Sequence, residues 1–189
     1  MENINLIYKY LEEYSKDSIM AFDDLMDRAE SESLFCGEDV PALCHLLLNI
    51  EKNLEDEASY NIQWSSKDRI TELIVMLALQ ESKPEYFEAI AEMMNQYEKL
   101  SRPYQEIVFN TFLAVFLLGS PEQDENEIKQ NRTLFLSALK QYTGEYKTIV
   151  GKFCEDSLNE WNEMENTGEI IPEVEDQKEI LLEIYHTIQ

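Results

Sequence analysis

The chain has few of the residues that interrupt regular structure, with five glycines and five prolines among 189 residues. They fall between segments of periodic hydrophobicity rather than inside them, which is typical of helix ends. Runs of alternating β-branched residues are lacking as well, and residues that favour helices dominate. These scarcities argue against a β-rich fold. They also exclude a phosphate-binding loop, which needs clustered glycines before a helix.

Cysteine is scarce too, and the three present are an odd number without a close pair. A disulfide framework needs an even number and a metal ribbon needs close pairs, so we expect reduced thiols. Cys44 and Cys154 stand apart in the sequence, and Cys44 lies in a leucine-rich segment, which predicts a small core residue. Cys36 stands beside Gly37 in a break and is predicted to be the most exposed thiol. Because it has no basic neighbour, we expect no lowering of its pKa and no nucleophilic role.

Only two histidines are present, which limits the possible metal sites. Glu183 and His186 have the Glu-x-x-His spacing that places both side chains on one helix face, as in di-iron bundles. Such a site needs a second copy, and the residue three before His45 is Ala42. We therefore expect no metal, no cofactor and no catalytic residue.

Long apolar runs are missing, since the longest, from Phe112 to Leu118, is far shorter than a membrane span. Residues 1–14 lack the basic region followed by an apolar stretch that marks a secretory signal. Together with the unpaired cysteines, these features predict a cytoplasmic protein.

Basic residues are heavily outnumbered, with 15 Lys and Arg against 39 Asp and Glu and a formal net charge of -24. Such a surplus repels nucleic acid and anionic lipid and attracts cationic surfaces. Residues 61–120 hold 8 acids and 5 bases, whereas residues 1–60 hold 15 and 4, and residues 121–189 hold 16 and 6. Because hydrophobic residues make up 44% of the chain, this charge belongs to a folded body rather than to a disordered tail.

Apolar residues recur at the helical spacing i, i+3, i+4, i+7 along most of the chain. Residues 55–64 are predicted to be an acidic loop, with Ser65 and Asp68 starting the helix that follows. Gly119 and Pro121 are predicted to end a helix. The periodicity predicts about nine helices, near 3–14, 18–32, 39–50 and 65–81, from 82 onward, and near 101–118, 122–142, 145–165 and 176–188.

Short connections between helices force neighbours to run antiparallel. We therefore predict a single all-α domain over residues 1–189, built from about nine antiparallel helices, with the apolar segment 66–118 in its core. Two architectures stay open. One is an irregular helical-repeat stack of the HEAT or armadillo kind, and the other is a globular helical bundle, since no repeat of fixed period is present.

The strongest candidate for a binding site is the acidic stretch 155–183, which has 11 acids and one base, Lys178. Carboxylates around an aromatic anchor suit a basic partner, because the apolar centre supplies binding energy and the acids supply steering. The plainer interpretation is a solvated helix face with a tryptophan in the core. The predicted partner-binding residues are Glu160, Trp161, Glu163, Glu165, Glu169, Glu173, Glu175 and Asp176.

A second group of acids near the N-terminus is either a further lobe of the same surface or an ordinary solvated face. Its members are Asp23, Asp24, Asp27, Glu30, Glu32, Glu38 and Asp39.

We interpret the chain as an acidic inhibitor that binds a cationic protein. In class, though through no shared motif, this is similar to the bacterial immunity proteins that neutralise toxins. A nuclease or another nucleic-acid enzyme has a basic cleft, and an acidic surface that covers it excludes the substrate. We expect a monomer that is not an enzyme and binds neither nucleic acid nor membranes directly.

Two alternatives use the same features differently. A mimic of the phosphate backbone, which inhibits a host DNA- or RNA-binding enzyme, would space its carboxylates like phosphates. A helical-repeat scaffold that binds a peptide would instead place aromatic residues such as Tyr97, Tyr104 and Tyr142 in a groove.

Overall fold

The helices of this protein follow the hydrophobic periodicity closely. The computed structural model describes residues 2–13, 15–52, 60–98, 105–120, 123–167 and 173–188. Within these ranges there are nine α-helices and no strand, so the all-α prediction is confirmed. The elements are α1 (Glu2–Glu13), α2 (Lys16–Ser31), η1 (Gly37–Asp39), α3 (Val40–Lys52), α4 (Tyr60–Glu81), α5 (Pro84–Glu98), α6 (Gln105–Leu113), η3 (Ala114–Leu118), α7 (Glu125–Tyr142), α8 (Tyr146–Thr167) and α9 (Glu173–Ile188).

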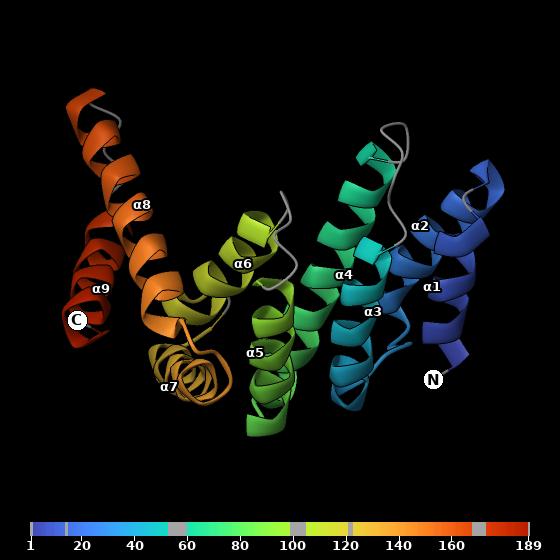
Figure 1. The fold of residues 1–189 in the computed structure, drawn as a ribbon, viewed down its shortest axis with the longest axis horizontal. Coiled ribbons are helices and arrows are strands. Elements are labelled where there is room, and N and C mark those ends of the chain that lie inside the picture. The colour runs from blue at the N-terminus through green and yellow to red at the C-terminus, as the bar shows by residue number, and fades with distance from the viewer. Residues whose placement is uncertain are drawn as a thin grey trace.

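The helices are arranged along the long axis of the molecule in the order of the chain (Figure 1). The N-terminus lies at the end formed by α1 and α2, and the C-terminus lies at the opposite end, beside α8 and α9. Helices that follow each other in this way make most of their contacts with near neighbours in sequence, as in stacked helix pairs.

Contacts between alternate helices define two layers. In one layer each helix contacts the next member of the series α1, α3, α5 and α7. In the other layer each helix contacts the next member of the series α2, α4, α6 and α8. The pairing of α5 with α7 and of α3 with α5 is especially extensive. This pattern is the one expected of stacked helix pairs, and the assignment to a repeat class stays a prediction.

The core is centred on phenylalanines from α5, α6, η3 and α7. The ring centroid of Phe116 lies 5.1 Å from that of Phe87 and 4.9 Å from that of Phe135, and Phe112 stacks on Phe116 at 6.0 Å. All four side chains are fully buried. Aromatic pairs at these separations add to the free energy gained by burial. The prediction that segment 66–118 contributes to the core is therefore confirmed.

The start of α4 differs from the prediction. The helix begins at Tyr60 rather than at Ser65, so residues 60–64 are helical and not part of a loop. Residues 53–59, the rest of the predicted loop, lie outside the described residues. Ser66 and Lys67 are buried, at 4% exposure or less, within this helix. Packing of that turn against the protein outweighs the weak preference of a serine for a helix start, which explains the error.

The element that follows α6 has an unpredicted form. It is η3, in which Ala114–Leu118 form a π-helical turn, and Gly119 follows with a φ of 93°. A Cβ atom on Gly119 would lie 2.5 Å from the side chain of Ile128 on α7. Both the positive φ and this close approach require glycine, so the predicted stop at Gly119 is confirmed with its physical cause.

Candidate partner-binding surface

Helix α8 presents its acidic residues because its apolar residues fix its orientation. Val150, Phe153, Cys154 and Trp161 are buried and are spaced so that they share one face of the helix. This face packs against the rest of the protein and against α9. The polar residues between them are consequently directed outward.

The outward face carries a line of three carboxylates, Asp156, Glu160 and Glu163, which we call the α8 acidic stripe. The spacing i, i+4, i+7 places the three side chains one above another along the helix. All three are exposed. Within the part of the chain that the structure describes, none of the three forms an ion pair. The stripe therefore offers unneutralised negative charge to a partner.

Helix α9 lies antiparallel to α8 and holds it in place. Near one end, the Nζ atom of Lys178 donates to Glu165 Oε1 at 2.7 Å and to Asn162 Oδ1 at 3.1 Å. Near the other end, the hydroxyl of Tyr185 donates to Glu155. Lys178 thus neutralises one of the predicted site residues, Glu165, and leaves the stripe on the neighbouring face unpaired.

The other predicted site residues divide into two groups. Trp161 is only 9% exposed, so in this conformation its indole anchors α8 in the core instead of offering an apolar contact to a partner. Glu169 lies outside the described residues, and for three residues at the start of α9 only the backbone is described. These three are Glu173, Glu175 and Asp176.

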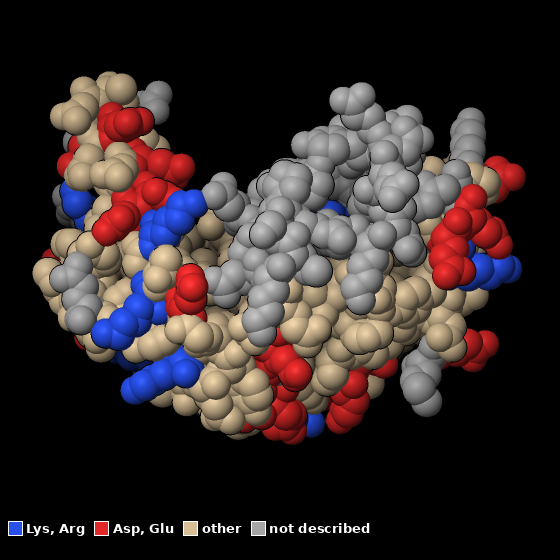
Figure 2. All heavy atoms as spheres, in the orientation of Figure 1, with Lys and Arg blue, Asp and Glu red and all other residues tan. Residues whose placement is uncertain are grey.

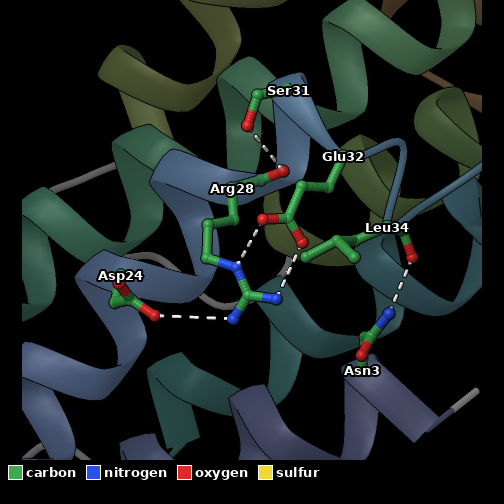
Figure 3. A network of polar contacts seen from close by, with 6 residues as sticks. All are labelled: Asn3, Asp24, Arg28, Ser31, Glu32 and Leu34. Carbon is green, nitrogen blue, oxygen red and sulfur yellow. Dashed lines mark hydrogen bonds and ion pairs between the residues drawn. The ribbon is translucent and has the colours of Figure 1, made fainter.

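The acids of α2 are largely engaged with arginines (Figure 3). The guanidinium of Arg28 donates to both carboxylate oxygens of Glu32, at 3.0 and 2.7 Å, and lies 3.6 Å from Asp24. The hydrogen bonds from Arg28 lower the pKa of Glu32 below its ordinary value. Asn3 of α1 donates to the carbonyl of Leu34 at 2.7 Å and joins α1 to the segment that follows α2.

Two further acids of α2 pair with a helix of the same layer. Arg69 of α4 donates to Asp23 at 3.2 Å and also contacts Asp27. Because these carboxylates are already partnered, the N-terminal acids form a cross-linked surface between α2 and α4. Glu30 belongs to the same predicted group, and its side chain lies outside the described residues.

Acids near η1 form a third network. Lys83 pairs with Glu81 and lies 3.5 Å from Glu38, and the Tyr86 hydroxyl donates to Glu81 at 3.0 Å. Hydrogen bonding from Lys83, followed by that from Tyr86, lowers the pKa of Glu81 below its ordinary value. Asp39 accepts a hydrogen bond from the Cys36 amide at 3.1 Å. Through Lys83, Glu38 and Glu81 therefore link η1 to the end of α4.

The exposed thiol lies beside this network, as the sequence predicts. Cys36 is exposed, while Cys44 and Cys154 are buried. Hydrogen bonding to Glu38, with burial and the charge of Asp39, raises the pKa of the Cys36 thiol. Acidic neighbours therefore disfavour the thiolate, and the expectation that the pKa of Cys36 is not lowered is confirmed.

A basic segment interrupts the acidic sequence and was not predicted as a separate region. Residues 129–154 contain five bases, Lys129, Arg132, Lys140, Lys147 and Lys152, and one acid, Glu145. Figure 2 shows blue side chains below the acidic arm at the left, with a red group among them. Counting charge in windows shorter than a third of the chain would have revealed the segment. The acidic surface is therefore interrupted by a positive region at the start of α8.

An apolar groove between α4 and η3 was also missed. It has a volume of about 550 Å³ and is bordered by Val75, Met76 and Leu79 of α4 and by Val115 of η3. No periodic pattern could have revealed it, because Val75 and Val115 are far apart in sequence and adjacent only in the fold. Of the tyrosines predicted to line a peptide groove, Tyr142 does not line this one. The Tyr142 hydroxyl donates to Glu88 at 3.1 Å, Tyr104 lies outside the described residues, and the side chain of Tyr97 does too.

Comparison of the chain with protein-family models, with curated proteins and with solved structures gives no match. Among the described residues, none of the helices combines the length and the apolar content that a membrane crossing requires.

Proposed function

We propose that this protein is an acidic inhibitor of immunity or antitoxin type, which neutralises a cationic bacterial toxin by covering its basic surface. The observation that carries the proposal is the α8 acidic stripe. Its three carboxylates are exposed and form no ion pair within the described residues, whereas Asp23 and Glu32 near the N-terminus and Glu165 on α8 itself are paired.

The stripe has a cost for the protein on its own. Asp156 and Glu160 are four residues apart, and Glu160 and Glu163 are three apart, so their like charges repel each other along the helix. Each such pair destabilises an isolated helix by about 0.2–0.5 kcal/mol. Burial of Trp161 and the packing of α9 offset this cost and keep the charges in a fixed row. A partner with a basic surface would convert the repulsion into attraction on binding.

Inhibition follows from electrostatic complementarity. The overall charge of -24 accelerates the approach of a cationic protein, and the stripe orients the complex that forms. Association steered in this way reaches roughly 10⁸ M⁻¹s⁻¹ at low salt. A nuclease whose basic cleft faces the stripe would lose access to its substrate. Three free thiols accord with action in the reducing cytoplasm.

The test is affinity capture at low salt with the whole protein as bait. The proposal predicts a basic protein that binds at low ionic strength and is released by about 0.5 M NaCl, because exposed charge pairs are screened there. Purified, that partner should lose its activity at a one-to-one ratio with the bait. Retention of only acidic or salt-resistant proteins, or full activity of the captured partner in the complex, contradicts the proposal.

A further inference from the structure

The groove between α4 and η3 supplies the apolar contact that α8 lacks. With Trp161 buried, the acidic stripe provides charge but no apolar anchor. Charge gives rate and orientation, while burial of apolar side chains in a well-packed pocket gives most of the affinity of a protein complex. A tight inhibitor of the proposed kind therefore needs an apolar site elsewhere on its surface.

The groove has the composition of such a site. Val75 is buried, and Met76, Leu79 and Val115 are half-buried, so together they form an apolar floor. The other lining residues are polar, namely Glu72, Gln80, Thr111, Ser120 and Gln123. A volume of about 550 Å³ lies within the range of ordinary ligand sites. From Glu72 to Gln80 the groove follows α4 for about 12 Å at 1.5 Å per residue, which is long enough for side chains one helical turn apart.

The local backbone adds a second observation. One wall of the groove is the π-helical turn Ala114–Leu118, to which Val115 belongs. Turns of this kind are rare and are frequent at functional sites. This one is held by Arg132 of α7, whose Nε atom donates to the carbonyl of Leu117 at 2.6 Å. The wall of the groove is therefore a rigid part of the fold.

Charge around the groove indicates the occupant. Glu72 is the one charged side chain among the described residues that line it. Asp68 is exposed one turn before Glu72 on the same helix. An apolar floor with acids along α4 is complementary to a helix that carries apolar residues on one face and basic residues beside them.

We propose that this groove binds an amphipathic cationic helix of the partner protein. The inference rests on the proposed function and adds to it the segment of the partner that is recognised. Apolar side chains of the helix, one turn apart, would lie on Val75, Met76 and Val115, while its lysines or arginines would face Glu72 and Asp68 of α4.

The experiment uses the whole protein with its seven methionine methyl groups labelled with ¹³C. The probes are a synthetic amphipathic helix of leucine and lysine and a peptide of equal length and charge with serine in place of leucine. The Met76→Gln variant identifies the methyl signal of Met76, which lines the groove, because that signal is absent from its spectrum. Met20→Gln is the matched control, because Met20 is 61% exposed on α2 and does not line the groove.

The leucine peptide should shift the Met76 signal and leave the Met20 signal in place. Met76→Gln should weaken its binding about tenfold, as expected for the loss of one apolar contact, while Met20→Gln should not. Equal binding of both peptides without a shift of the Met76 signal contradicts the proposed binding in the groove. It does not contradict the proposed acidic inhibitor. Shifts at both methionines also contradict binding in the groove, because they show unspecific binding. Failure of both peptides to bind at low salt overturns the groove together with the proposed function.

Discussion

Arg132 and the carbonyl of Leu117 join α7 to the π-helical turn η3 through a hydrogen bond of 2.6 Å. Leu117 is fully buried, so its carbonyl has little access to water. The guanidinium is half-buried, and desolvation lowers its pKa below the ordinary value for arginine. A partly buried charge placed on a carbonyl near the end of a helix is an efficient way to stabilise an irregular turn.

Replacing Arg132 with methionine should therefore destabilise the protein by about 1–3 kcal/mol, the usual cost of an unpaired buried carbonyl. Lys129→Met is the control, because Lys129 is 68% exposed on the same helix and lies 3.7 Å from an exposed Glu125. The measurement is the free energy of unfolding in urea. Equal values for the two variants would show that the bond does not support the turn.

Gly119→Ala should also destabilise the protein, by roughly 2 kcal/mol or more, because a φ of 93° is unfavourable for alanine and a Cβ atom would meet Ile128. Gly144→Ala is the matched control, since a Cβ atom there has no neighbour within 4 Å. Thermal unfolding of both variants compares the two sites directly. A stable Gly119→Ala variant would contradict the described end of η3.

Lowering the pH should remove the contribution that the Glu81 carboxylate makes to the free energy of unfolding. Its folded-state pKa is lowered below 4.5 by hydrogen bonds from Lys83 and then Tyr86. A lowered pKa means that this contribution is present above the unfolded value and is lost as pH falls through the folded one. Glu81→Gln should thus lose less stability than the unmodified protein between about pH 5 and pH 3. Glu85→Gln, at an exposed position on α5, should follow the unmodified protein.

Cys36 should react slowly although it is the exposed thiol. Its pKa is raised by Glu38 and Asp39, so little thiolate forms near neutral pH. Mass spectrometry after treatment with iodoacetamide should show one slow modification in the folded protein and three in denaturant, since Cys44 and Cys154 are buried. Glu38→Gln combined with Asp39→Asn should accelerate the first reaction. An unchanged rate in that variant would contradict the assigned cause.

Local patterns predicted the parts of this protein that depend on one helix at a time. The spacing of Val150, Phe153 and Trp161 is enough to orient α8, so the exposure of Glu160 and Glu163 followed from the sequence. The sequence does not decide whether Trp161 is a core residue or a partner contact, because a tryptophan with that spacing suits both.

Features that depend on several helices were not predictable in this way. Lys178 neutralises Glu165 only because α9 returns antiparallel to α8. The groove arises where Val75 of α4 meets Val115 of η3, and the π-helical form of η3 depends on Arg132 of α7. The helical start at Tyr60 was missed because packing of buried Ser66 and Lys67 outweighs the local preference for a cap.

The most direct test of the acidic inhibitor compares association rates for two variants of equal net charge. One carries Glu160→Lys and Glu163→Lys on α8, and the other carries Glu85→Lys and Glu92→Lys at exposed positions on α5. With the captured cationic partner at low salt, measured by stopped flow, the α8 variant should associate at least about tenfold more slowly than the α5 variant. Equal rates would show that the stripe does not direct the encounter and would contradict the account.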